Sequence, residues 1–293
     1  MVLKPVTERL PLTDQCLHYD ELHEVPENIR KSVNITSLTS PTRQPTTNPF
    51  LPPNFLLYTN NTLLRYWHQR YSIFQYYDYD IRMTNDAWFG VTPEPVAVRI
   101  ATDLANRPST RSKRTLIDLF AGAGGNTIAF ALSKRWDRII AIEMDAPTLA
   151  CAQHNAEEVY GVPPGVITWV HADCFDFLEA AKRAWDSDEA ADEILDPSLQ
   201  INPEETTIFA SPPWGGVNYS DYEVFDLNTM EPYGLDRLNK ECRPMEHTLF
   251  LPRTSDLRQI AKLVPPHGEK IDVVQYCMEG ASKAMVAFIP AGY

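Results

Sequence analysis

The sequence predicts an α/β fold built on a largely parallel sheet, and two features of its pattern lead to that prediction. From residue 115 onward, short apolar segments alternate with longer segments whose apolar residues recur at helical spacing. This alternation is typical of parallel strands joined by helices that cover both faces of a sheet. The last two apolar segments, 270–278 and 284–290, follow each other without a helix between them. They predict a terminal hairpin and therefore an antiparallel edge.

The elements of this core are expected in regular order along the chain. The predicted strands cover residues 115–120, 138–145, 166–173, 206–214, 247–252, 270–278 and 284–290. The predicted helices cover residues 126–133, 147–160 and 175–185. Residues 186–205 interrupt the pattern with eight acidic residues and neither Lys nor Arg. Such a run predicts a solvated loop on the far side of the sheet.

The first part of the chain differs from this core in amino-acid composition and pattern. Residues 36–54 hold twelve Pro, Ser or Thr, five of them prolines, which predicts an extended linker or strap. Residues 63–74 are aromatic and basic with a helical period, and 86–101 predict a turn followed by a helix that accepts Pro93 and Pro95 in its first turn. We divide the chain into three parts: an N-terminal extension with the strap (1–62), a helical extension (63–110) and the core (111–293).

Composition excludes several classes of protein. The 293 residues are 44% hydrophobic and 11% aromatic, enough to bury a sizeable core. The net charge of −13 argues against a broad basic face for long nucleic acid, but not against a pocket for one nucleotide. No run approaches the ~18 apolar residues of a membrane span, and no signal peptide is recognisable. The five cysteines form no Cys-x-x-Cys pair, so we expect a soluble protein of a reducing compartment, without a structural metal.

A glycine-rich turn follows the first predicted strand. Asp118 lies inside the end of that strand, and Gly122, Gly124 and Gly125 lead into a helix. Glycines let the backbone approach a ligand closely, but this spacing differs from that of dinucleotide-binding turns. An acid before the turn suits a ligand with a cationic amino group rather than a pyrophosphate.

Two more acids end the next two strands. Glu143 can accept both hydroxyls of a ribose, and Asp173 is placed for an adenine amino group. Together with Asp118, these strand ends describe S-adenosylmethionine. The alternative is that each carboxylate merely caps the next helix; three successive strand ends beside the glycine turn favour the ligand.

The turn Ser211-Pro212-Pro213-Trp214 follows the fourth strand, at the edge where open α/β sheets bind ligands. Two prolines fix the backbone and leave its carbonyls without competing amide donors. These carbonyls can therefore accept hydrogen bonds from an exocyclic amine and localise the lone pair of its nitrogen. Trp214 can stack on a base, most strongly on a cationic ring. The turn thus predicts methylation of a base amine. Serine at 211, where amino-methyltransferases commonly have Asn or Asp, weakens the case for adenine. The alternative is a structural turn with a core tryptophan.

Six motifs in this order resemble the trimethylguanosine synthase family: RYWHQRYSIF (65–74), WFGVTPE (88–94), DLFAGAGGNTIAFAL (118–132), HNAEEVYG (154–161), SPPWGG (211–216) and FLPR (250–253). The likeness extends over about residues 63–290. That family transfers two methyl groups from S-adenosylmethionine to N2 of a 7-methylguanosine RNA cap. The resemblance therefore implies a Rossmann-like S-adenosylmethionine-dependent methyltransferase core with an N-terminal helical extension, and no metal.

The resemblance also implies roles for individual residues. Donor binding is expected from Thr92, Asp118, Phe120, Gly122, Asn126, Glu143 and Asp173. The amine would be oriented by Ser211 and Pro212. The cap would be bound by Trp214 stacking on the base, Asn155 touching it, Phe74 closing the pocket, and Arg65 and Arg253 at the triphosphate. The sequence departs from the family at Gly90, where the family has a serine, and by small insertions before Glu143 and within HNAEEVYG.

The resemblance further implies capped snRNA and snoRNA as substrates and a location in the nucleus, in particular the nucleolus, with the cytoplasm as the alternative. Residues 1–60 either strap the core or recruit ribonucleoprotein partners, and the sequence does not choose. Two other functions stay open at this stage: an adenine or amide N-methyltransferase of the same fold, and a catalytically inactive cap-binding module.

Overall fold

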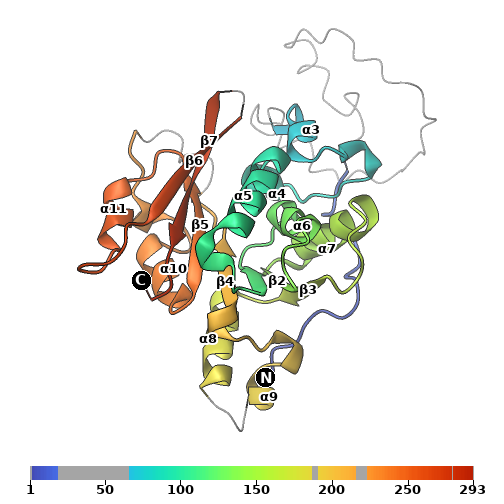
Figure 1. Cartoon of the computed structure of the whole chain (residues 1–293). Coiled ribbons are helices and arrows are strands. Elements are labelled where there is room, and N and C mark those ends of the chain that lie inside the picture. Colours follow the sequence, from blue (N-terminus) through green and yellow to red (C-terminus); the bar gives the residue numbers. More distant parts are fainter. Residues whose placement is uncertain (1, 19–65, 187–190, 216–222, 279, 293) are drawn as a thin grey trace, which may run out of the picture.

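A seven-stranded sheet forms the centre of the molecule, in the strand order β3-β2-β1-β4-β5-β7-β6 (Figure 1). The structure, a computed structural model, describes residues 2–18, 66–186, 191–215, 223–278 and 280–292. The strands are β1 (Thr115–Asp118), β2 (Arg138–Glu143), β3 (Ile167–His171), β4 (Thr206–Ala210), β5 (Glu246–Pro252), β6 (Asp272–Met278) and β7 (Ala281–Ile289).

The strand directions confirm the predicted, mostly parallel sheet with its terminal hairpin. Strands β1 to β5 pair in parallel, whereas β7 runs antiparallel to both of its neighbours, β5 and β6. The antiparallel strand is therefore not the edge: β7 lies one position inside, and the edge strand β6 runs in the same direction as the core strands.

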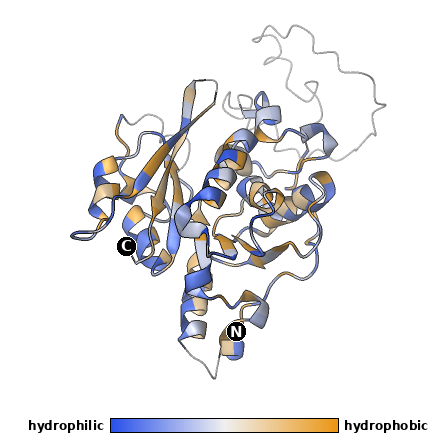
Figure 2. Cartoon of the chain, viewed as in Figure 1, coloured by the Kyte–Doolittle hydropathy of each residue, from blue (hydrophilic) through white to orange (hydrophobic). Residues whose placement is uncertain are grey.

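Helices cover both faces of this sheet (Figure 1). One face carries α5 (Glu94–Asn106), α6 (Gly125–Leu132) and α7 (Ala146–His154); the other carries α8 (Cys174–Trp185), α10 (Leu235–Cys242) and α11 (Leu257–Lys262). Successive strand residues point to opposite faces, so Leu116 belongs to the first apolar cluster and Ile117 to the second. Figure 2 shows hydrophobic residues concentrated between the layers.

Shorter elements complete the described chain. They are α3 (Arg70–Ile73), η3 (Tyr77–Tyr79), α4 (Ala87–Gly90), η4 (Pro108–Thr110), the π-helical turn η5 (Asn155–Val159), α9 (Ala191–Ile194), η6 (Pro197–Leu199), η7 (Pro203–Glu205) and η9 (Leu227–Thr229). The predicted helix at 63–74 is thus interrupted, and its first residues lie outside the described ones. The helix predicted within 86–101 is confirmed as α5, with Pro95 in its first turn as expected, whereas Pro93 precedes the helix as its N-cap residue.

The N-terminal residues 2–18 lie along the outer side of the core. The amide of Val6 donates to the carbonyl of Trp169 in β3 (2.8 Å), and Leu17 forms an antiparallel bridge with Met83. The predicted strap at 36–54 lies outside the described residues.

Of the acidic segment 186–205, residues 186 and 191–205 are described, and residues 191–205 lead into the amino end of β4, away from the carboxyl ends of the parallel strands. It is not simply a solvated loop, because Leu195 and Leu199 are fully buried. Arg138 donates to the carbonyls of Ser198 (3.2 Å) and Gln200 (2.6 Å), which fastens the segment to β2.

Two further findings concern membrane-spanning helices and metal-binding groups among the described residues. No helix among them has the length and apolar character needed to cross a bilayer. Nor do three or more His, Cys, Asp or Glu side chains in this part of the chain form a group that could hold a metal ion.

Candidate active site

The predicted donor residues meet at the carboxyl edge of the sheet, because β1, β2, β3 and β4 are neighbours that all end there. The loop after β1 is bonded to both adjacent strands: Leu119 donates to Phe209 of β4 (3.0 Å), and Ala121 donates to Ile142 of β2 (2.8 Å). The sequence-predicted glycine turn is therefore held in the middle of the edge.

Asp118 is completely buried at the end of β1. One carboxylate oxygen accepts from the Thr127 hydroxyl (2.6 Å) and the other from the Phe120 amide (3.3 Å). Burial raises the pKa of Asp118 to about 6, against the lowering effect of these two hydrogen bonds, and nearby Glu143 raises it slightly further. A buried carboxylate whose charge is only partly compensated suits a cationic partner such as an α-amino group.

Glu143 connects the ends of two loops. Its carboxylate accepts from the amide of Gly122 (3.0 Å) and from the amide of Asp145 (2.9 Å). Burial raises its pKa, while the backbone hydrogen bonds oppose this rise. Gly122 has φ +53°, and a Cβ added to it would meet no atom within 4 Å, so open space lies in front of this turn.

Thr92 of the VTPE motif lies against the glycine turn. Its hydroxyl accepts from the Asn126 amide nitrogen (2.9 Å), and both side chains are buried. The amide oxygen of Asn126 is buried and accepts no hydrogen bond from the described residues. An orphaned buried acceptor beside an open glycine turn fits a polar ligand that donates a hydrogen bond there.

Asp173 caps α8. Helix capping was the alternative to donor binding that the sequence left open for the acids at the strand ends. One carboxylate oxygen accepts from the Phe175 amide (2.7 Å), and the other accepts from the Tyr233 hydroxyl. The Tyr233 ring lies 4.3 Å from the Phe175 ring and 6.0 Å from the Phe120 ring. Tyr233, which bonds Asp173, thus belongs to a cluster of aromatic rings with Phe175 and Phe120 near the carboxyl ends of β1 and β3.

The Ser-Pro-Pro-Trp turn follows β4 directly, next to the glycine turn. Trp214 stacks on Phe250 of β5 (ring centroids 5.6 Å apart, 19° between planes) and donates from Nε1 to the Phe250 carbonyl (3.3 Å). The Ser211 hydroxyl has no hydrogen-bond partner among the described residues. Pro212 is buried while Pro213 is exposed.

The other predicted cap residues do not gather in one place. Phe74 is 2% exposed and packs in the core, with its ring 6.1 Å from that of Tyr160. Asn155 is fully buried and bonded to backbone on three sides, which disagrees with the expectation that it touches the base. Arg253 is exposed just after β5 and makes no ion pair within the described chain. Arg65 lies outside the described residues.

Comparison with known proteins shows the family to which the chain belongs. The profile of a family described as RNA cap guanine-N2 methyltransferase matches residues 113–292. The chain belongs to this family. It is therefore an S-adenosylmethionine-dependent methyltransferase that acts on the guanine N2 of RNA caps, and the resemblance found in the sequence is confirmed.

Two curated relatives are trimethylguanosine synthases of yeasts. That of Schizosaccharomyces pombe is 33% identical over 228 residues, which are 77% of this chain and 85% of the relative. That of Saccharomyces cerevisiae is 30% identical over 209 residues, 69% of this chain but only 58% of the relative. A crystal structure from Porphyromonas gingivalis W83, assigned as a methyltransferase, superposes with a TM-score of 0.52 at 14% identity. It covers 84% of this chain and 53% of its own, and supports the methyltransferase fold alone.

In this RNA cap guanine-N2 methyltransferase, several neighbours of the site carry no recognisable signal in the sequence. Tyr233 lies in an irregular segment before α10, where no periodicity or motif marks it. Phe250, which supports Trp214, begins the FLPR motif, so that motif did contain the information.

Proposed function

We propose that this chain transfers two methyl groups to N2 of 7-methylguanosine RNA caps and so forms 2,2,7-trimethylguanosine. The observation that carries this proposal is the Trp214 indole, held parallel to Phe250 beside the donor turn. A cationic N7-methylated guanine gains more from an indole face than a neutral base does.

We place S-adenosylmethionine at the carboxyl ends of β1 to β3. The residues present fit it: Asp118 offers a buried carboxylate for the amino group, Glu143 oxygens for the ribose, and Asn126 an unpartnered acceptor. Thr92, Phe120, Gly122 and Asp173 complete the proposed set. When bound, the donor supplies an electrophilic methyl group on a sulfonium.

Ser211 and Pro212 hold the amine in line for attack in this proposal. The Ser211 hydroxyl and the carbonyls of the turn accept hydrogen bonds from the N2 amino group. These bonds keep the nitrogen lone pair directed at the methyl carbon. The new N–C bond forms as the C–S bond breaks, and the proton lost from N2 passes to water. No strong general base is required, because the amine becomes acidic only once it is methylated.

Cap recognition is proposed for Trp214 at the base and Arg253 and Arg65 at the triphosphate, with Phe74 supporting the pocket from within the core. Consistent with the phosphate role, Arg253 has an exposed side chain that no acid of the described chain neutralises. Capped snRNA and snoRNA as substrates, ribonucleoprotein partners of the N-terminal segment and a nuclear or nucleolar location are part of the same proposal and rest on the kinship with the yeast enzymes.

The deciding experiment incubates the protein with labelled donor and m7GpppG, GpppG or uncapped RNA that contains adenosine, and identifies products by mass. We expect two methyl groups on m7GpppG and little product elsewhere. Labelled adenosine would favour the adenine methyltransferase instead. Tight cap binding without any product would indicate an inactive cap-binding module.

A further inference from the structure

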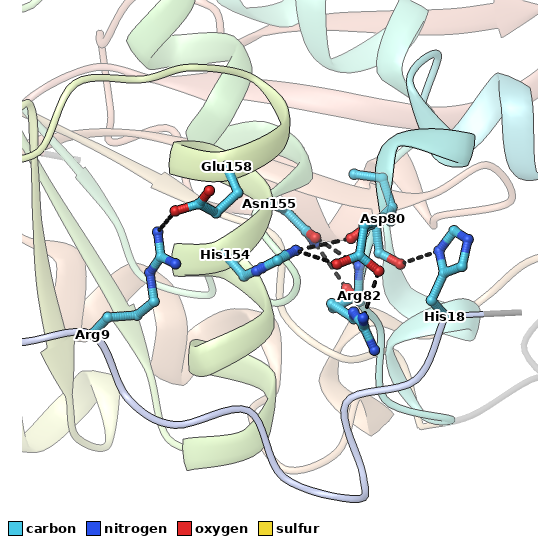
Figure 3. Close-up of polar contacts among 8 residues, drawn as sticks. Arg9, His18, Asp80, Arg82, His154, Asn155 and Glu158 are labelled. Atoms are coloured by element: carbon cyan, nitrogen blue, oxygen red, sulfur yellow. Dashed lines mark hydrogen bonds and ion pairs between the residues drawn. The ribbon is translucent and has the colours of Figure 1, made fainter. Parts of the chain in front are cut away.

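Residues 80–83 are held like the central strand of a small sheet, although they form no regular strand. On one side, Leu17 exchanges both backbone hydrogen bonds with Met83 (2.9 Å each), and a ring nitrogen of His18 bonds the carbonyl of Ile81 (2.8 Å). On the other side, side chains at the end of α7 take the place of a neighbouring strand (Figure 3).

Asn155 is the main partner on that second side. Its amide oxygen accepts a hydrogen bond from the backbone N–H of Arg82 (2.8 Å), and its amide nitrogen donates one to the backbone carbonyl of Arg82 (2.8 Å). The side chain thus copies the two bonds that a paired strand residue would make. The second hydrogen of the amide nitrogen donates to the carbonyl of Ala123 (3.0 Å).

Ala123 lies inside the glycine turn, between Gly122 and Gly124. Asn155 therefore joins two segments that the chain separates widely: the proposed donor turn and residues 80–83. Only an amide can do this, because the three bonds require two donors and one acceptor from the same group. An aspartate of the same shape would set a carboxylate oxygen against two carbonyl oxygens.

Two further polar contacts hold Asp80 beside the pairing of Asn155 with Arg82. Arg82 pairs with the Asp80 carboxylate (2.5 Å), and His154 bonds the Asp80 carbonyl (2.9 Å) (Figure 3). Burial raises the pKa of Asp80, but His154 and Arg82 outweigh it and hold that pKa below its usual value. Asp80 has φ +72°, a conformation that non-glycine residues adopt only when their surroundings hold it.

A π-helical turn, Asn155–Val159, begins at Asn155. Single π turns are frequent at functional sites. The wider turn also presents Glu157 and Glu158 to Arg9 of the N-terminal segment (2.9 and 2.7 Å). The same short stretch thus contacts residues 80–83, the glycine turn and the N-terminal segment.

We infer that Asn155 is a positioning residue that fixes the donor-binding glycine turn by joining it to residues 80–83, and that it does not read the base. It acts on methyl transfer through Ala123, without touching either substrate. The inference rests on the proposed donor site and replaces the role expected for Asn155 from the resemblance.

The test compares Asn155→Ala with a matched control, Asn239→Ala. Asn239 is also a buried amide, bonded to His247 at the amino end of β5 and far from the site. We expect Asn155→Ala to weaken donor binding about tenfold by calorimetry, while Asn239→Ala leaves it unchanged at a comparable loss of melting temperature. The KM for the donor should rise in parallel, with the KM for m7GpppG unchanged.

A measurement without ligand completes the test. Amide hydrogen exchange at residues 122–126 should become faster in Asn155→Ala and stay as in the wild type in Asn239→Ala. Asn155→Asp, which keeps the shape and loses both donors, should act in the same direction if the alanine variant folds poorly.

Three outcomes with the variants would overturn the inference alone, and a fourth, with the wild type, would also overturn the proposed function. Unchanged donor affinity in a folded Asn155→Ala protein rejects it, as does an equal loss in Asn239→Ala, which would indicate general destabilisation. A selective rise in the KM for the cap would indicate that Asn155 contacts the guanine base. A wild type that binds no donor would instead reject the proposed function, and the inference with it.

Discussion

The burial of Asp118 has opposite consequences for stability and for ligand binding. Its pKa is about 6 in the fold, against 3.8 for the exposed group, because burial disfavours the charge. The folded state therefore binds a proton more tightly than the unfolded chain between these two values. The contribution of this residue to stability is present at low pH and is lost as pH rises through about 6.

Asp118→Asn should separate the two consequences. We expect the ligand-free variant to be more stable than the wild type at pH 7.5 by roughly 1–3 kcal/mol, and the gain to vanish near pH 4. Donor binding should be lost at both pH values, since the amino group no longer meets a negative charge. Thermal unfolding and calorimetry measure the two effects. A variant less stable than the wild type at pH 7.5 would contradict the argument from burial.

Trp214 carries the second prediction at this scale. Because its indole is anchored on Phe250, it offers a fixed flat surface to the base. A cation over such a face gains about 0.5–2 kcal/mol, so m7GpppG should bind several-fold to a few tens-fold more tightly than GpppG. Trp214→Ala should remove most of this preference and Trp214→Phe should keep part of it. Donor affinity serves as the control and should not change. Equal affinity of the wild type for both cap analogues would refute the stacking.

Among the elements, the glycine turn and the VTPE segment determine each other's position. A Cβ on Gly125 would lie 3.1 Å from Val91 Cγ2 and 3.2 Å from the Thr92 carbonyl, both tighter than an ordinary contact. The absence of a side chain at Gly125 therefore lets residues 91–92 approach the start of α6 and brings Thr92 to Asn126.

Gly125→Ala should push these two elements apart. We expect a loss of roughly 1–3 kcal/mol in stability from overpacking, with a clear loss of donor affinity as the Thr92–Asn126 bond is strained. Gly90→Ala is the control, because a Cβ there meets nothing within 4 Å and should leave both quantities unchanged. Adding Val91→Ala to Gly125→Ala should restore part of the loss. Full donor affinity in Gly125→Ala would show that the spacing of these elements does not matter for the site.

For the whole molecule, the net charge of −13 limits how RNA can be held. Each phosphate that a protein neutralises adds affinity that falls with salt, and an acidic surface offers few such contacts. Recognition should therefore concentrate at the cap and its triphosphate.

Capped oligonucleotides of increasing length provide the measurement. We expect these oligonucleotides to bind at most about threefold more tightly than m7GpppG. The slope of log affinity against log salt concentration should be shallow, and it should fall by about one in Arg253→Ala. Titrations at several salt concentrations give both numbers. A tenfold or greater gain with length and a steep slope would reveal an RNA-body surface that the net charge does not suggest.

The sequence by itself determined the features that depend on local pattern. The alternation after residue 115 indicated the sheet and its covering helices. The acids and prolines at strand ends marked the edge at which we propose that the ligands bind, because parallel strands end on the same side. Motifs in the correct order were enough to indicate the family. The strand order within the terminal hairpin was not accessible, since either strand could pair with β5.

Only the tertiary structure decided which polar groups meet. Asn155 and Arg82 are 73 residues apart, and no periodicity relates them. Asp173 caps α8, as the alternative interpretation of the strand-end acids predicted, and its second oxygen accepts from Tyr233, a contact that no local pattern indicates; its role in donor binding stays a prediction. Gly125 was recognisable as a turn residue, but its neighbour Thr92 comes from another motif. Local sequence sets which conformations a segment prefers, whereas such contacts follow from how the packed layers bring distant segments together.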